Sequence, residues 1–261
     1  MDEQRVTIAI EDGVADVRLN RPDKLNAIDP AMFAAIAAAI EQLAATDELR
    51  AVVLSGEGRA FCAGLDMASM ASGGSGLDIH ARPYGDANLV QQVAWGWRQL
   101  PVPVIAAIRG VCFGGGMQIA SGADVRIAAS DARFAIMEMK WGIVPDMAGY
   151  ALWRTLLRDD VLRELSYTAR EVGADEALRI GLATRIADDP HGEAMALARS
   201  IADRHPQAIR AAKRLANLAA DASAASLLLG ESDEQARLLR TPNQIEAVRA
   251  NIEKRRPVFG D

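Results

Sequence analysis

The sequence predicts an α/β fold with a mainly parallel sheet, followed by a helical C-terminal region. Two patterns carry this prediction. Short apolar runs alternate with helix-like stretches up to about Ala148, which is typical of βαβ units, and helix-like stretches then follow one another to the C-terminus. The chain has 261 residues, half of them apolar, so it is long enough to bury a sizeable core in one large domain or two smaller ones.

The first element expected is a β-hairpin. Arg5–Ile10 and Val14–Leu19 are short alternating or apolar runs, and Asp12-Gly13 between them is a favoured two-residue turn. A helix is expected next, from Asp29-Pro30 to about Ala45, because aspartate is a good N-cap and proline suits the first helical position.

Three buried strands and one irregular segment follow. The strands are expected at Ala51–Ser55, Val104–Ile108 and Val125–Ala129. The pattern dissolves between Ala68 and Ala87, where Ser72–Gly76 is rich in glycine and serine. A loop of this length in a compact domain is usually a functional lid or a disordered segment, and we favour a lid because it follows directly on a glycine motif.

The C-terminal half is expected to be helical. The candidate helices are Gly149–Leu157, Asp160–Thr168, Asp175–Arg179, Glu193–Arg204, Pro206–Leu218, Ser223–Arg240 and Thr241–Lys254, and Ala183–Ile186 is a candidate last strand. We therefore divide the chain into a core over residues 1–190 and a helical oligomerisation region over residues 191–261. The tail helices carry more apolar surface than a small region can bury alone, which favours self-association.

Composition excludes several classes of partner. The 35 acidic and 29 basic residues give a net charge of −6, which argues against nucleic acid or an anionic membrane as a bulk partner. Cys62 and Cys112 fit neither a disulfide framework nor a metal motif. Met1–Ile10 lacks the regions of a secretory signal, and no apolar run reaches the roughly 18 residues of a membrane span. We expect a cytoplasmic protein with no membrane segment and no bound metal.

Two glycine-containing segments are candidates for chemistry. In Arg59–Met67, small residues let the backbone approach a ligand closely. In Gly110–Ala120, the three glycines Gly114–Gly116 follow a buried strand and open an apolar helix, whose first N–H groups attract an oxyanion. The spacing fits neither a dinucleotide-binding motif nor a Walker A motif. Taken alone, the glycine run is equally consistent with a tight strand-to-helix turn.

Together these segments resemble the crotonase family, also called the enoyl-CoA hydratase/isomerase superfamily. The resemblance extends along nearly the whole chain, over Asn20–Pro22, Lys24–Ala27, Phe61–Asp66, Pro103–Ile108, Gly114–Gly116, Ala123–Ala128, Phe134–Pro145 and Lys254–Phe259. It implies a crotonase-like ββα-superhelix (spiral) core with a C-terminal helical trimerisation region. It also implies an acyl-CoA substrate, no cofactor beyond the CoA moiety of that substrate, and a homotrimer or a dimer of trimers.

The resemblance implies a site as well. The backbone N–H groups of Leu65 and Gly115 would form an oxyanion hole for the thioester oxygen, and fixed donors there stabilise an enolate more than the substrate. Substrate and CoA contacts are implied at Lys24, Leu25, Ala27, Ala63, Gly64, Asp66, Gly114 and Gln118. Lys24 and the Lys254–Arg256 cluster would meet phosphates, since nearby cations help to hold them.

Three positions separate the activities of the family. Two-glutamate hydratases carry Glu at the positions of Gln118 and Glu138, single-glutamate isomerases use the Glu138 position, and dienoyl-CoA isomerases carry acids at the Gln118 and Asp146 positions. Gln118 is thus a departure, because an amide cannot accept a proton at neutral pH. Moving a double bond needs only one base that takes a proton from one carbon and returns it to another. Glu138 is the expected proton shuttle, and Asp146 is a candidate second group or a helix N-cap.

Three functions remain open at this point. The residues favour double-bond isomerisation of a 3-enoyl- or 3,5-dienoyl-CoA through an enolate. Hydration of a trans-2-enoyl-CoA is the alternative. A non-catalytic acyl-CoA binder is the third, and the intact glycines and Glu138 speak against it.

Overall fold

The main sheet of the computed structural model, which describes residues 4–71 and 78–260, has six strands in the order β1-β2-β3-β4-β6-β9. They span Val6–Glu11, Val14–Leu19, Ala51–Gly56, Val104–Ile108, Val125–Ala128 and Arg185–Ile186. β1 and β2 are antiparallel, and every other neighbouring pair is parallel. Asp12 and Gly13 both have positive φ, 50° and 76°, so the predicted hairpin turn is confirmed.

A second, smaller sheet joins three very short strands that the sequence pattern did not reveal. β5 (Val111–Phe113) pairs in parallel with β7 (Arg133–Ala135), and β7 pairs antiparallel with β8 (Val172–Gly173). β5 leads directly into helix α4 (Gly115–Ser121). This sheet therefore fixes the start of the helix that the glycine run opens.

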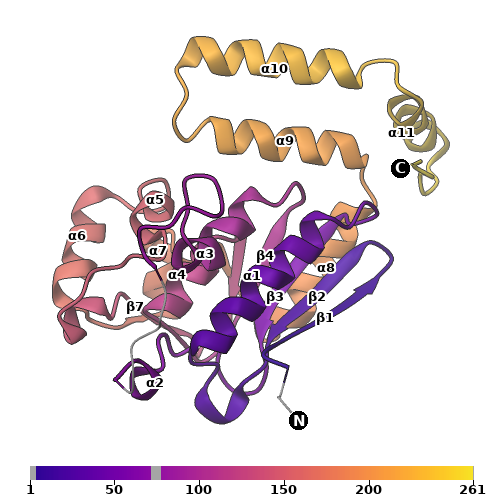
Figure 1. Ribbon diagram of the computed structural model, residues 1–261. Coiled ribbons are helices and arrows are strands. Elements are labelled where there is room, and N and C mark those ends of the chain that lie inside the picture. The colour runs from indigo at the N-terminus through magenta and orange to yellow at the C-terminus, as the bar shows by residue number, and fades with distance from the viewer. Residues whose placement is uncertain (1–3, 72–77, 261) are drawn as a thin grey trace.

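Helices cover both faces of the main sheet (Figure 1). α1 (Pro30–Ala44), α3 (Leu89–Gln99) and α4 enclose one apolar layer with the sheet, and α8 (Pro190–Ala202) covers the other face. Burial on both faces is what near-continuous apolar parallel strands require. The Asp29 side chain accepts a hydrogen bond from the Met32 N–H, so the predicted cap of α1 is confirmed.

Shorter elements connect these layers. They are η1 (Pro22–Lys24), α2 (Met67–Ala71), η2 (Glu138–Trp141), α5 (Gly149–Trp153), α6 (Asp159–Thr168) and α7 (Ala174–Ile180). α5 ends four residues before the predicted end, and the chain continues to Leu157 in tight turns. In the region of the predicted lid, α2 covers its start, and residues 72–77 lie outside the described residues.

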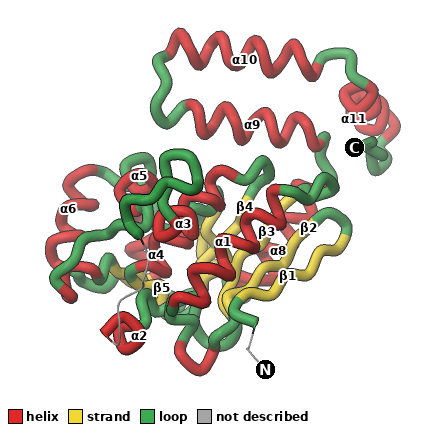
Figure 2. The backbone as a smooth tube through the Cα atoms, viewed as in Figure 1, coloured by secondary structure: helices red, strands yellow, loops and turns green. Residues whose placement is uncertain are grey.

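The last three helices stand apart from the sheet as a separate layer (Figures 1 and 2). They are α9 (Pro206–Leu218), α10 (Ala224–Leu238) and α11 (Pro242–Glu253). The buried Lys213 ammonium attaches α9 to the core, because it donates to the Trp97 and Val102 carbonyls and to Asp124 at 3.3, 2.7 and 2.9 Å. α8 packs on the sheet, although the predicted division at residue 190 places it with the tail. That division stays a prediction.

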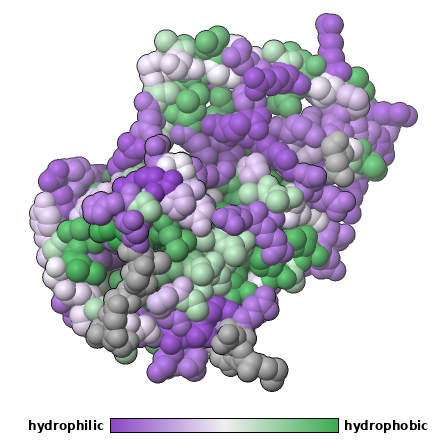
Figure 3. Space-filling view, viewed as in Figure 1, coloured by the Kyte–Doolittle hydropathy of each residue, from purple (hydrophilic) through white to green (hydrophobic). Residues whose placement is uncertain are grey.

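The tail layer leaves apolar side chains exposed between polar ones, as Figure 3 shows. Leu228, Leu229 and Ile252 are 63%, 64% and 77% exposed. Among the described helices, none is long and apolar enough to cross a membrane.

Candidate active site

The two glycine-containing segments lie side by side. Backbone hydrogen bonds join them in a parallel ladder, with the Cys62 N–H donating to the Val111 carbonyl at 3.1 Å and the Phe113 N–H donating to the Cys62 carbonyl at 3.0 Å. β5 carries the second segment into α4, and the first continues towards α2. Residues about fifty positions apart in the sequence thereby face one another at the start of α4.

Two glycines give this junction a backbone that other residues rarely adopt. Gly64 has φ +91°, and a Cβ atom there would lie 2.9 Å from the Phe113 carbonyl oxygen and 3.6 Å from the Gly115 nitrogen. Gly114, the N-cap of α4, has φ 49° and ψ −121°. Only a residue without a Cβ atom takes such conformations readily. The turns at these glycines bring the Leu65 and Gly115 backbones to one place.

The Leu65 and Gly115 N–H groups have no hydrogen-bond acceptor among the described residues. By contrast, their neighbours Asp66 and Gly114 donate to the Ile28 and Ala135 carbonyls at 2.9 Å each. Both bare donors belong to residues that line one cavity. They can therefore hold a developing oxyanion there, in the manner of an oxyanion hole.

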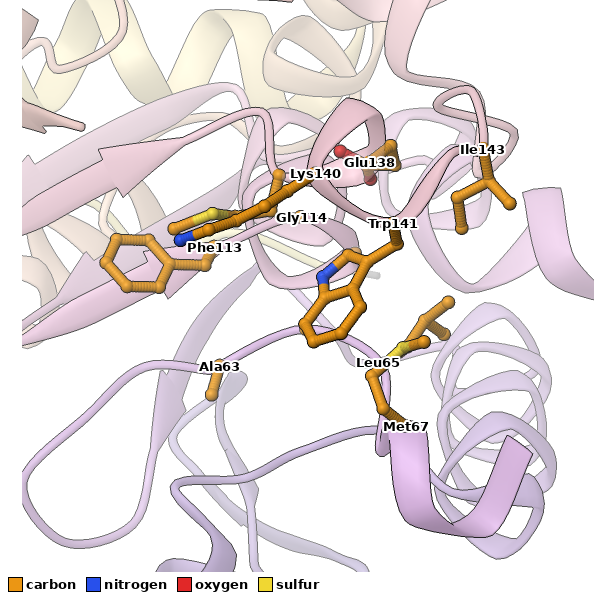
Figure 4. Close-up of a pocket in the computed structure, with 12 residues that line it drawn as sticks. Ala63, Leu65, Met67, Phe113, Gly114, Glu138, Lys140, Trp141 and Ile143 are labelled. Carbon is orange, nitrogen blue, oxygen red and sulfur yellow. The ribbon is translucent and has the colours of Figure 1, made fainter. Parts of the chain in front are cut away.

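The cavity has a volume of about 170 Å³. Its walls are Ala63, Gly64, Leu65, Met67, Phe113, Gly114, Gly115, Met137, Glu138, Lys140, Trp141 and Ile143. Figure 4 shows the first glycine segment and Met67 on one side, and Phe113, Gly114, Glu138 and Lys140 on the other. Sites that enclose a whole drug-sized ligand measure roughly 300–1,000 Å³, so this cavity fits the reacting end of a longer molecule.

Glu138 is the only carboxylate among the described residues that line the cavity, and it is 5% exposed. Its Oε1 accepts a hydrogen bond of 2.6 Å from the Gln118 amide, and its Oε2 is buried and has no partner in the described part of the chain. Burial raises the pKa of Glu138, and the negative charge of Asp146 raises it further. A carboxylate with one free oxygen and a raised pKa is suited to moving a proton.

Gln118 stands behind Glu138. It lies in α4, is 1% exposed and does not line the cavity. Its amide oxygen accepts from the Met147 and Gly149 N–H groups at 2.9 Å each. The Gln118 amide thus faces Glu138 and the backbone at the start of α5. The direct substrate contact predicted for Gln118 stays a prediction.

Asp146 belongs to the segment between η2 and α5. The residue is exposed, although neighbouring atoms partly desolvate its carboxyl and thereby raise its pKa. It is not the N-cap of α5, because that position is Ala148 and no side chain caps the helix. The cap that the sequence left open is thus not formed, and the catalytic role stays a prediction.

The residues with predicted CoA contacts gather next to the cavity. The loop after η1 runs beside the first glycine segment, with the Ala63 N–H donating to the Leu25 carbonyl at 2.9 Å and the Ile28 N–H donating to the Gly64 carbonyl at 2.8 Å. Ala27 lies between these pairs, and Lys24 is exposed in η1. The Asp66 carboxylate is paired with Arg21 at 2.7 Å. The contacts themselves stay predictions.

Asn26 holds this loop in place, a role that its place in the Lys24–Ala27 motif did not predict. Its buried amide donates to the Ala60 carbonyl at 2.9 Å and to the Phe61 carbonyl at 3.2 Å, and its amide oxygen accepts from the Arg21 N–H at 2.8 Å. It has φ +56°, which asparagine tolerates better than most residues. The sequence offered one signal for this role, the short amide side chain of Asn26 within Lys24–Ala27.

The two cysteines and the Lys254–Arg256 cluster do not line the cavity. Both cysteines are free and buried, and burial raises the pKa of the Cys62 thiol to about 12, so neither is reactive. In the Lys254–Arg256 cluster, Arg255 pairs with Glu246 and Glu253 of the tail, and the phosphate contact predicted for the cluster stays a prediction.

Known proteins resemble this chain throughout its length. A family model described as enoyl-CoA hydratase/isomerase matches residues 9–261. The chain is 32% identical over 269 residues to the mitochondrial Delta(3,5)-Delta(2,4)-dienoyl-CoA isomerase of Homo sapiens, covering 96% of this chain and 79% of that protein. It is 33% identical over 259 residues to the short-chain-enoyl-CoA hydratase of Clostridium acetobutylicum, covering 98% and 97%.

A solved structure agrees with both. The crystal structure of an enoyl-CoA hydratase from Bacillus anthracis matches with a TM-score of 0.89 at 28% identity, covering 98% of this chain and 99% of that one. Relatives named as isomerase and as hydratase therefore stand at similar identity. The likeness shows the family, whereas the specific reaction depends on the residues of the site.

Proposed function

This chain belongs to the enoyl-CoA hydratase/isomerase family, as an enzyme with the crotonase fold, and we propose that it moves a double bond in an unsaturated acyl-CoA. The substrate class is a 3-enoyl- or 3,5-dienoyl-CoA. The observation that carries the proposal is that Glu138 alone supplies a carboxylate to the described wall of the cavity, while an amide, Gln118, stands behind it.

The reaction begins at the carbon next to the thioester. The free Oε2 of Glu138 takes a proton from C2, and the electron pair of that C–H bond moves into the thioester as an enolate. The Leu65 and Gly115 N–H groups bind the enolate oxygen, and each such donor lowers the barrier by roughly 3–4 kcal/mol. The electrons then return through the chain, the double bond moves into conjugation, and the far carbon takes the proton back from Glu138.

A 3,5-dienoyl-CoA places the receiving carbon farther from C2 than a 3-enoyl-CoA does. A single carboxylate therefore reaches both C2 and the receiving carbon less easily in a 3,5-dienoyl-CoA. Asp146 would then supply the proton at the far carbon while Glu138 removes the one at C2, and a proton passing between them would restore the starting state. Partial desolvation raises the pKa of Asp146 above its usual value, which is the direction that a proton donor needs.

Hydration is the second candidate, because a relative named short-chain-enoyl-CoA hydratase is 33% identical. Adding water requires one group to take a proton from water and another to protonate the α-carbon. The Gln118 amide can do neither at neutral pH. We expect hydration to be slower than isomerisation by roughly the 10²–10⁴-fold that one acid–base group supplies.

The test is the substitution Glu138→Gln, which keeps the size of the side chain and removes the base. We expect turnover of 3-enoyl- and 3,5-dienoyl-CoA, followed by the absorbance of the conjugated product, to fall roughly 10²–10⁴-fold. Glu11→Gln, an exposed change at the end of β1, is the matched control and should keep full activity. Full activity of Glu138→Gln on every substrate would show that another group is the base.

A further inference from the structure

The orientation of the Gln118 amide is determined by its partners. Two backbone donors, the Met147 and Gly149 N–H groups, point at one atom of the carboxamide from 2.9 Å, so that atom must be the oxygen. The nitrogen is consequently the atom that faces Glu138, at 2.6 Å from Oε1. A carboxamide is the group that accepts on one side and donates on the other.

The same arrangement distinguishes the two oxygens of Glu138. Oε1 is held by the Gln118 amide, and Oε2 is left buried and without a partner in the described part of the chain. Glu138 lines the cavity and Gln118 does not. A free oxygen on a fixed carboxylate is what a proton shuttle needs, because the proton has a single place to bind.

Gln118 also reaches the segment that carries Asp146. Its oxygen holds the N–H of Met147, the next residue in the chain. The Met147 sulfur packs over Gly115, where a Cβ atom would come within 2.7 Å of it. One buried side chain therefore contacts the proton shuttle and holds the backbone next to the second acid, on a segment that also packs against the oxyanion hole.

We propose that Gln118 is a positioning residue, whose carboxamide links Glu138 to the segment before α5 and leaves Oε2 of Glu138 as the oxygen that carries the proton. This inference rests on the proposed function for the role of Glu138. In this role Gln118 holds Glu138 in place, whereas a carboxylate at that position would take a proton from water.

Electrostatics gives the proposal a measurable consequence. Donation from Gln118 favours the ionised form of Glu138, and so opposes burial, which raises the pKa, and the charge of Asp146, which raises it further. Lys140 is the other charged residue among the described residues of the cavity wall. The charges of α6, which packs on η2, are at the surface and paired, as in Arg163 with Asp159 and Arg170 with Glu164.

Two substitutions separate the two contacts of the amide. Gln118→Glu keeps an oxygen for the Met147 and Gly149 N–H groups, but it loses the donor and adds a negative charge beside Glu138. Gln118→Leu loses the donor and the acceptor without adding charge. The pKa of Glu138 should therefore rise from the wild type to Gln118→Leu, and again to Gln118→Glu, with a first step of about one to two units for a lost charge-assisted hydrogen bond.

The measurement is a ¹³C NMR titration of glutamate-labelled protein, with the Glu138 signal assigned by its loss in Glu138→Gln. The acid limb of kcat/KM should move to higher pH in the same order, from the wild type to Gln118→Leu and then to Gln118→Glu. The activity that these variants lose at neutral pH should therefore return at high pH. Gln92→Leu, which removes a buried amide from α3 away from the cavity, is the matched control and should move neither quantity.

Two results would overturn the proposal. One is an unchanged pKa of Glu138 in both folded Gln118 variants. The other is a loss of activity that is equal at every pH, which would indicate a merely structural role. The titration needs no substrate, so it decides the role of Gln118 even if product analysis of the wild type shows hydration and thereby removes the proposed function.

Discussion

At the residue scale, the proposed reaction depends on how three side chains share protons. Glu138 is buried, with one oxygen bound and the other without a partner among the described residues. Gln118 accepts and donates but cannot take a proton, and Asp146 acts on Glu138 through its charge. Because a base works only when ionised, and the pKa of Glu138 is raised, activity should fall as the pH drops through that raised value. A substitution that raises or lowers the pKa of Glu138 should move the pH at which activity falls in the same direction.

Asp146→Asn removes a negative charge near Glu138. The pKa of Glu138 should fall, so the acid limb of kcat/KM should move to lower pH, and it can be followed with a 3-enoyl-CoA. If Asp146 supplies the proton at the far carbon, turnover of a 3,5-dienoyl-CoA should fall roughly 10²–10⁴-fold while 3-enoyl-CoA is still isomerised.

Asp12→Asn, in the β1–β2 turn where either residue is favoured, is the control for this change and should leave both rates intact. An acid limb that moves upward in Asp146→Asn would contradict the electrostatic account. Equal losses on the two substrates would remove the separate role of Asp146 with dienes.

At the element scale, the turn into α4 and the strand-like segment beside it build the proposed oxyanion hole. Gly64 permits the close approach, because its φ of +91° and the 2.9 Å between a Cβ position and the Phe113 carbonyl oxygen leave no room for a side chain. The Leu65 N–H follows directly, so its direction depends on this turn. The element, rather than any side chain, positions the donor.

Gly64→Ala should therefore move the Leu65 N–H away from the oxyanion. We expect kcat/KM to fall roughly 10²–10³-fold, the usual effect of losing one donor, with the protein still folded by circular dichroism. Gly85→Ala is the matched control, since Gly85 also has positive φ (69°) but has open space around it. It should cost about 1 kcal/mol of stability and no activity, and an equal loss in both variants would refute the placement of the donor.

Sequence patterns predicted the elements that have local signals. The β1–β2 hairpin, the capped start of α1 and the helix after Gly114 each follow from residues within a few positions. α3 was not predicted, although Asn88 and Gln91 form a capping box at its start. The small sheet of β5, β7 and β8 could not be predicted, because strands of two or three residues depend on tertiary pairing.

The sequence likewise predicted which residues form the candidate site, but not their long-range contacts. The motifs placed the Leu65 and Gly115 N–H groups and the Glu138 side chain near one another, and the structure brings all three residues to one cavity. The partners of Gln118 were not accessible, because the two N–H groups that hold its oxygen are 29 and 31 residues away in the chain. Such contacts exist only once the fold is complete.

At the scale of the whole molecule, α9, α10 and α11 form a layer with exposed apolar side chains. A layer of this kind is typical of surfaces that bury themselves against another chain. The homotrimer or dimer of trimers implied by the sequence stays a prediction. It gives a definite expectation, a solution mass of three or six times the 27.9 kDa of one chain, measured by analytical ultracentrifugation.

Leu228 and Leu229 offer a way to test that layer. The double change Leu228→Glu and Leu229→Glu should lower the solution mass, because charge on an apolar interface opposes association. Ser232→Glu, an exposed polar position on the same helix, is the matched control and should leave the mass unchanged. A wild-type protein with the mass of a single chain would contradict the expected assembly.

We propose that this site moves a double bond more readily than it adds water. Proton NMR of the products that the wild-type enzyme forms from 3-enoyl-CoA and from crotonyl-CoA, under the same conditions, tests it most directly. We predict that 3-enoyl-CoA is converted to the conjugated 2-enoyl-CoA, and that crotonyl-CoA stays unhydrated over the same time. Rapid formation of 3-hydroxybutyryl-CoA from crotonyl-CoA, with 3-enoyl-CoA unchanged, would contradict it.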